Sequence, residues 1–164
     1  MNFTIDEMKE IDWNQVSVIY MEGIETKLAT FQSEAPSWKE WDKSHIEACR
    51  LVARSGNEIL GWAALSPTSS RCVYKGVSEV SVYIGKSFRG MGIGSSLLKE
   101  LVHLSEEAGF WSLQSGIIRE NISSIHLHEK CGFRVIGIKE KPAKMESGEW
   151  HDVVLMERRS KLIG

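Results

Sequence analysis

Long apolar stretches, cysteine pairs and an excess of one charge are all missing from this sequence of 164 residues. No run approaches the ~18 consecutive apolar residues that a membrane-spanning helix requires, so no membrane span is expected. Lys and Arg total 20 against 22 Asp and Glu. This balance leaves no broad basic face for phosphate contacts, so nucleic acid is not an expected partner. Only 3 prolines are present and no linker divides the chain, which predicts one domain over residues 1–164.

The cysteines are few and show no pairing pattern. Cys49, Cys72 and Cys131 are odd in number, and none belongs to a C-x-x-C motif. This argues against a disulfide framework or a zinc ribbon, and no metal site is expected. The first residues, MNFTIDEMKEIDWNQ, are acidic and lack the apolar core of a signal peptide. We therefore expect a cytoplasmic protein.

The apolar pattern predicts helices interleaved with strands. Helices are expected at 12–26, with Asp12 as the N-cap, at 37–44, at 93–108 and at 121–130. Strands are expected at 1–6, 51–54, 59–65, 77–84, 111–118, 133–140 and 153–157, the last two separated by a polar loop that contains Pro142 and Gly148. This order predicts an α/β fold of mixed type, with a mostly antiparallel sheet flanked by helices. The 6 tryptophans predict substantial aromatic packing.

The strongest chemical signal is a glycine-rich turn between a strand and a helix. The strand 77–84 is followed by Arg89-Gly-Met-Gly-Ile-Gly94, which leads directly into the helix from Ile93. Backbone N–H groups at a helix start are unpaired and attract phosphate groups. Glycines let this backbone approach a ligand closely, because no Cβ intervenes. The segment predicts a site for a phosphate or pyrophosphate.

Two familiar nucleotide-binding patterns fit this turn poorly. A Walker A loop requires Gly-Lys-Ser/Thr, whereas Gly94 is followed by Ser95 and Ser96. A dinucleotide-binding fingerprint has G-x-G-x-x-G in the first β-α-β unit and an acidic residue about 20 residues later. Here the spacing is G-x-G-x-G, the turn lies past mid-chain, and the stretch 113–115 supplies no acid.

Arg89-Gly-Met-Gly-Ile-Gly94 resembles the R/Q-x-x-G-x-G/A motif of the GNAT acetyltransferases. The segment from Asn121 to Gly132-Phe133 resembles the second signature of that superfamily. The resemblance implies a GNAT fold, acetyl-CoA as cofactor and contacts to it from both signatures. The implied cofactor-binding residues are Val80, Val82, Tyr83, Ile84, Arg89, Gly90, Met91, Gly92, Ile93, Gly94, Ser95, Asn121, Ser124 and Lys130.

Several further segments are similar to the phosphinothricin and arsinothricin type of N-acetyltransferase. They include Glu79-Val-Ser-Val-Tyr83, Leu127-His-Glu-Lys-Cys-Gly-Phe133 and Gly148-Glu-Trp-His-Asp152. This resemblance implies a homodimeric enzyme that acetylates the α-amine of a small amino acid analogue. Its implied substrate-binding residues are Thr30, Phe31, Arg71, Tyr74 and His151, with Arg71 as the donor to a substrate carboxylate.

The reaction needs a base, because an amino-acid amine is mostly protonated at pH 7. Glu79 is the candidate: a carboxylate within a strand of β-branched residues is costly unless it has a role or a partner. An edge glutamate in water is the alternative. For the leaving thiolate, His128 is the candidate acid, since imidazole titrates near neutral pH, although a structural histidine fits the sequence equally well. No Ser-His-Asp arrangement is evident, which favours direct transfer.

Two other functions remain open at this stage. The first is acetylation of a different amine, such as an aminoglycoside, a polyamine or a protein N-terminus. The acids Glu7, Glu10, Glu34 and Glu40 are spread along the chain and do not predict a strongly acidic pocket for a polycation. The second is a non-catalytic module that binds CoA.

Overall fold

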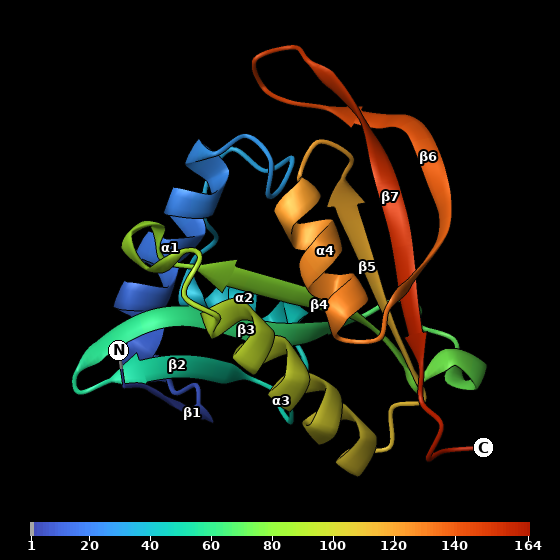
Figure 1. The fold of residues 1–164 in the computed structure, drawn as a ribbon, viewed down its shortest axis with the longest axis horizontal. Coiled ribbons are helices and arrows are strands. Elements are labelled where there is room, and N and C mark those ends of the chain that lie inside the picture. Colours follow the sequence, from blue (N-terminus) through green and yellow to red (C-terminus); the bar gives the residue numbers. More distant parts are fainter. Residues whose placement is uncertain (1) are drawn as a thin grey trace.

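The computed structural model describes residues 2–164, through which one seven-stranded sheet runs (Figure 1). Its strands are β1 (Thr4–Glu7), β2 (Leu51–Ser55), β3 (Glu58–Pro67), β4 (Val77–Ile84), β5 (Ser112–Ile118), β6 (Arg134–Lys144) and β7 (Trp150–Arg159). The spatial order is β1-β2-β3-β4-β5-β7-β6. Within the described part of the chain, β4 and β5 form the one parallel pair. The predicted mixed, mostly antiparallel sheet is confirmed; Met1, assigned above to the first strand, lies outside the described residues.

Helices cover both faces of this sheet (Figure 1). They are α1 (Trp13–Glu25), α2 (Trp38–Ser44), α3 (Ile93–Glu107) and α4 (Ile122–Lys130), with short 3-10 turns at Glu10–Asp12, Cys72–Tyr74 and Lys86–Phe88. The helices α1 and α2 pack on one face, and α3 packs with α4 on the other. Helix α3 ends where Gly109 takes the left-handed conformation, with φ +90°, as expected for a glycine after a helix.

Each face has its own apolar core. Beneath α3, a leucine stripe of that helix faces the sheet, with Leu97, Leu98 and Leu101 fully buried. The core beneath α1 and α2 is aromatic: Trp41 and Trp62 are fully buried and meet edge to face at 5.6 Å between ring centroids. Burial of rings this large contributes much of a small domain's stability. Trp41 and Trp62 therefore serve mainly to build this core.

Asp12 does not cap α1, contrary to prediction. A 3-10 turn precedes the helix, so Asp12 already has helical dihedral angles. Its buried carboxylate instead accepts from the Lys9 N–H at 2.9 Å and pairs with Arg54 at 2.9 Å. The Arg54 guanidinium and the Lys9 N–H together lower the pKa of Asp12 despite the opposing effect of burial.

The last two strands are longer than predicted. The expected polar loop begins only after Lys144, and Pro142 lies within β6. A proline is tolerated there because β6 is the edge of the sheet. The pairing with β7 is irregular between Lys139 and Ala143, and Lys141 has a left-handed φ of +43°.

Candidate active site

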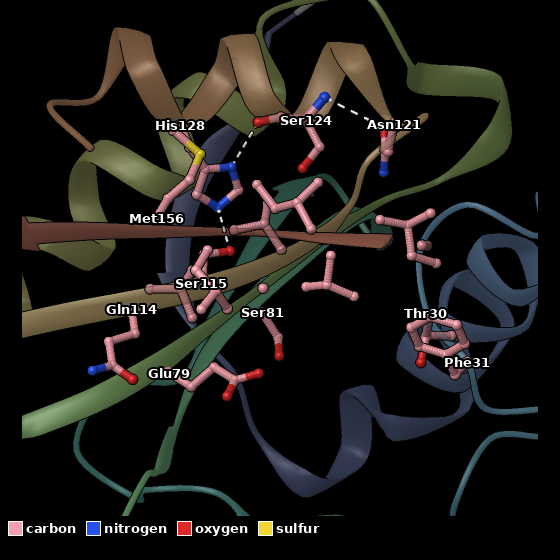
Figure 2. A pocket seen from close by; sticks show the side chains of 18 of the residues that line it. Thr30, Phe31, Glu79, Ser81, Gln114, Ser115, Asn121, Ser124, His128 and Met156 are labelled. Atoms are coloured by element: carbon pink, nitrogen blue, oxygen red, sulfur yellow. Dashed lines mark hydrogen bonds between the residues drawn. The ribbon is translucent and has the colours of Figure 1, made fainter. Parts of the chain in front are cut away.

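The central parallel pair of strands separates soon after it forms. Pairing between β4 and β5 joins Val77–Glu79 to Ser112–Gln114 and is not continued along the rest of β4. Residues 80–84 therefore pair with β3 on one side and have a free backbone edge on the other. Figure 2 shows the opening between the strands, with Glu79 and Ser81 on one side and Ser115 and His128 on the other.

The glycine-rich turn lies at the far end of β4. Gly90 and Gly92 have φ +78° and +80°, a conformation that side chains with a Cβ rarely adopt. Gly92 immediately precedes α3, so the unpaired N–H groups of the helix start adjoin the turn. A Cβ at Gly94 would lie 3.2 Å from Leu127 of α4, so glycine also permits close helix packing.

A cavity of about 640 Å³ follows this turn. Its walls include most of the predicted cofactor-binding residues: Val82, Tyr83, Ile84, Arg89, Gly90, Gly92, Ile93, Gly94, Ser95, Asn121, Ser124 and Lys130. Val80 lines the adjoining cavity instead. Met91 lines neither and has 54% of its surface exposed. The open turn, the helix start and the free edge of β4 suit a long cofactor that carries a diphosphate.

Two predicted cofactor residues have structural contacts of their own. The ring of Tyr83 stacks on Tyr20 and on Trp62, at 5.0 and 4.8 Å between centroids. Asn121 accepts from the Ser124 N–H at 3.4 Å, which caps α4, and donates through Nδ2 to the Leu28 carbonyl at 3.2 Å. The second bond joins the start of α4 to the loop between α1 and α2.

A second cavity, of about 760 Å³, occupies the space between the separated strands. It shares Val82, Tyr83, Asn121 and Ser124 with the first, so the two are adjacent compartments of one cleft. One carboxylate lines this cavity, that of Glu79 on β4. The compartment with a carboxylate thus adjoins the compartment formed by the glycine-rich turn.

Glu79 faces the cleft from the start of the free part of β4 (Figure 2). Its side chain reaches solvent through the cavity, yet surrounding protein removes part of its hydration. This partial burial raises the pKa of Glu79, and the positive charge of Lys139 opposes the rise. A carboxylate with a raised pKa is a better proton acceptor than an ordinary one.

His128 is buried on the opposite side of the opening, with 3% of its surface exposed. Its Nδ1 lies 2.7 Å from the Ser124 carbonyl, and its Nε2 lies 3.1 Å from Ser115 Oγ (Figure 2). A carbonyl can only accept, so Nδ1 carries the proton and the Ser115 hydroxyl donates to Nε2. Burial lowers the pKa of His128, so the ring is neutral at pH 7. The sequence left open a directly acting acid and a structural histidine, and in this arrangement neither nitrogen has a free proton to donate into the cleft.

The predicted substrate-binding residues do not all meet in the cleft. Thr30 and Phe31 line the cleft and lie at the right of Figure 2. His151 lies behind Phe31, 6.4 Å between ring centroids, and contacts Glu120 through Nδ1 at 3.1 Å. Arg71 and Tyr74 lie at the 3-10 turn before β4, outside both compartments, with the guanidinium 5.7 Å from the Tyr74 ring. The chain enters β4 at this turn and reaches the glycine-rich turn only at the other end of the strand.

Several residues that line the cleft were not among those predicted from the sequence. Lys139 of β6 and Gln114 of β5 line the cavity, as do Ser44, the last residue of α2, and His45, which follows that helix. The register pairs Gln114 with Glu79, so a correct alignment of β4 with β5 could have found it. Lys139 lay in a predicted strand with no motif to distinguish it. Within residues 2–164, no cluster of three or more His, Cys, Asp or Glu could hold a metal ion.

Comparison with known proteins agrees with this geometry. Residues 7–133 match the acetyltransferase (GNAT) family, and the chain belongs to it. It is an acetyltransferase, and the cofactor of the family is acetyl-CoA. It is 30% identical to the phosphinothricin N-acetyltransferase of Streptomyces viridochromogenes over 85% of this chain and 78% of that one.

Two other relatives extend the comparison. The L-methionine sulfoximine/L-methionine sulfone acetyltransferase of Pseudomonas paraeruginosa is 29% identical, over 65% of this chain and 62% of its own. The solved structure of a GNAT phosphinothricin acetyltransferase from Sinorhizobium meliloti, in complex with acetyl-CoA, superimposes with a TM-score of 0.85 at 28% identity. That match covers 97% of this chain and 89% of the other.

Proposed function

We propose that this chain transfers the acetyl group of acetyl-CoA to the α-amine of a small amino acid or amino acid analogue. The observation that carries the proposal is the divided cleft, in which the compartment with Glu79 adjoins that of the glycine-rich turn. The relatives named for phosphinothricin and methionine sulfoximine support this class of acceptor. We propose that residues 1–164 act as one N-acetyltransferase domain.

The cofactor would be held by backbone and small side chains. The N–H groups at the turn and the start of α3 suit its diphosphate, and Lys130 and Arg89 supply positive charge beside them. The free edge of β4 at residues 80–84 offers backbone groups to its amide-containing arm. When bound, acetyl-CoA supplies the acetyl group as a thioester.

We assign the proton acceptor to Glu79. The carboxylate takes a proton from the ammonium form of the acceptor, directly or through a water, and so generates the neutral amine that can attack a carbonyl carbon. Backbone N–H groups on the free edge of β4 near Val80 and Val82 are the candidates to stabilise the developing oxyanion. We propose that His128 orders Ser115 and α4 rather than acting as the direct acid.

Direct transfer fits the cleft better than an acetylated enzyme. None of the three cysteines lines either compartment, and burial raises the pKa of Cys49 to about 11. Ser115 contacts a histidine, but that ring is held by a carbonyl rather than a carboxylate and has a lowered pKa, which makes it a poor base. Intact mass measured after incubation with acetyl-CoA alone should therefore show no stable adduct.

The charges of the cleft disfavour a polycationic acceptor. The compartment that contains Glu79 is lined by that one carboxylate and by one lysine, Lys139, so it is not strongly acidic. Release of free thiol from acetyl-CoA tests the proposal with phosphinothricin, methionine sulfone, methionine sulfoximine, spermidine and kanamycin as acceptors. We expect turnover with the amino acid analogues. Turnover with spermidine or kanamycin alone would contradict the proposed acceptor, and silence with all five would favour a non-catalytic module.

We also propose that the enzyme is a homodimer that acts in the cytoplasm. Apolar side chains remain exposed on the edge strand β6, where Val135 and Ile138 are 47% and 49% exposed, and a second copy could cover them. The free thiols of Cys49, Cys72 and Cys131 suit a reducing compartment. No helix within residues 2–164 has the length and apolarity to span a bilayer. Light scattering after gel filtration tests the dimer, and a monomer mass would contradict it.

A further inference from the structure

The cleft has a positively charged side chain opposite its carboxylate. Lys139 of β6 lines the same compartment as Glu79 and is exposed to solvent. Two other cations are neutralised: Arg134 of the same strand pairs with Glu157 at 2.7 Å, and Arg119, just after β5, pairs with Asp152 at 3.1 Å. Within residues 2–164, Lys139 makes no ion pair, so its ammonium group is available to a ligand.

Strand register explains why Lys139 faces the cleft. Lys139 lies opposite Val153 of β7, which lies opposite Ile118 of β5. Residues directly opposite one another in antiparallel strands project from the same face, and both Val153 and Ile118 line the cavity. In the parallel register, Glu79 of β4 lies beside Gln114 of β5. Gln114 is four positions before Ile118, so the two side chains project from the same face of the sheet. Glu79 and Lys139 therefore project from one face of the sheet, on either side of β5 and β7.

Leu155 is the one residue other than glycine in a row of three that lies between these two charges. Gly116, Leu155 and Gly137 form one row across β5, β7 and β6, between the row of Gln114 and that of Lys139. A Cβ at Gly116 would lie 3.3 Å from Val153, and one at Gly137 would have no neighbour within 4 Å. A side chain at either position would rise into the space that separates the carboxylate from the ammonium group.

The irregularity in β6 begins at Lys139 itself. The pairing shifts between Lys139 and Ala143, and Lys141 adopts φ +43°, a conformation that is unfavourable for a residue with a side chain. The Lys141 N–H donates to Asp152 Oδ1 at 3.0 Å, and this carboxylate is the one that Arg119 holds. The shift brings Pro142 and Ala143 to the cavity wall. Backbone strain of this kind is common at functional sites.

We propose that Lys139 binds the α-carboxylate of the acceptor and thereby places its amine toward Glu79. This inference rests on the proposed acceptor class and names the residue that recognises it. It replaces Arg71, which lies outside the cleft. The opposing effect of Lys139 on the pKa of Glu79 agrees with two charges that sense each other across one cavity. An amino acid carries both complementary charges, and therefore satisfies both side chains at once.

The test compares methionine sulfone with its α-carboxamide, which keeps the amine and loses the negative charge. The variant is Lys139→Met, which retains the apolar stem. A charge-assisted hydrogen bond contributes roughly 1.5–3 kcal/mol, so we expect Lys139→Met to raise KM for methionine sulfone about ten- to hundredfold, with kcat changed less than about threefold. KM for the carboxamide should stay the same, and Lys139→Arg should retain most of the affinity for the acid.

Lys144→Met is the matched control, because Lys144 belongs to the same strand but lies over Trp150, 5.7 Å from its ring, outside the cavity. It should match the wild type with both acceptors. An equal loss with acid and carboxamide in Lys139→Met, or no loss with either, would overturn the assignment while leaving the proposed function standing. Absence of wild-type turnover with methionine sulfone would instead count against the proposed acceptor class, and the role of Lys139 would fall with it.

Discussion

Replacing Glu79 with glutamine tests the centre of the proposed chemistry. The amide keeps the size and hydrogen-bonding capacity of the side chain but cannot accept a proton at neutral pH. The cleft lining includes no other carboxylate, so no neighbour can take over the role. General-base catalysis contributes about 10²–10⁴-fold. We therefore expect kcat/KM at pH 7 to fall by roughly two to four orders of magnitude in Glu79→Gln.

The pH dependence makes this prediction specific. Partial burial raises the pKa of Glu79, so the wild-type rate should begin to fall on the acid side at a pH above 4.5, the ordinary value. In Glu79→Gln the amine must lose its proton to solvent, so the deficit should shrink about tenfold for each unit by which the pH rises, until the pKa of the amine is reached. The variant profile is thus displaced to higher pH.

The assay is thiol release from acetyl-CoA with methionine sulfone between pH 6 and 9.5. Glu140→Gln is the matched control, because Glu140 is exposed on β6 and does not line the cleft. It should leave the profile unchanged. A ratio of wild-type to Glu79→Gln rates that stays constant across this range would refute the role of Glu79 as the base, since a lost contact need not vary with pH.

Three further predictions concern the cofactor turn, acid stability and the core. In Gly92→Val the backbone at φ +80° would be strained by about 1–2 kcal/mol or more. We therefore expect the Kd for acetyl-CoA, measured by calorimetry, to rise roughly tenfold. An unchanged Kd would contradict the assignment of the turn. Burial lowers the pKa of both His45 and His128, so the unfolded chain binds protons more readily, and the urea-derived free energy of unfolding should decrease as pH drops through about 6.5. This decrease should be smaller in His128→Gln, and an equal decrease would mean that the ring is not protected in the folded state. Trp41→Ala removes a fully buried ring and should lower the free energy of unfolding by about 3–5 kcal/mol, whereas a loss below about 1 kcal/mol would contradict the buried aromatic core.

Local sequence signals located the helices and strands, apart from the ends of the last two strands, and the glycine-rich turn. The alternation along residues 77–84, the glycines that follow and the leucine stripe of α3 are each encoded over fewer than two dozen consecutive residues. Such signals specify dihedral angles and buried faces directly. The placement of Glu79 on the strand that leads to the turn followed from the same short segment.

The remaining errors concern contacts between distant segments. The Nε2 atom of the buried His128 contacts Ser115, which lies on a different element, β5, and spacing along α4 does not reveal this. Arg71 was placed by resemblance, but its turn enters β4 at the end remote from the glycines. Lys139 faces the cleft through the register of β6 with β7, and register is not readable from a strand pattern alone.

The separation of β4 from β5 has a consequence for the energetics of the whole molecule. A sheet interrupted at its centre leaves main-chain donors and acceptors hydrated where other sheets pair them, so this region should open more easily than its surroundings when empty. The proposed pairing of the cofactor's amide-containing arm with the free edge of β4 would supply these missing partners, and only in the native state. Saturating acetyl-CoA should thus raise the melting temperature and slow amide exchange in the middle of the sheet. The resistance of the protein to heat and to proteolysis should therefore depend on the concentration of acetyl-CoA.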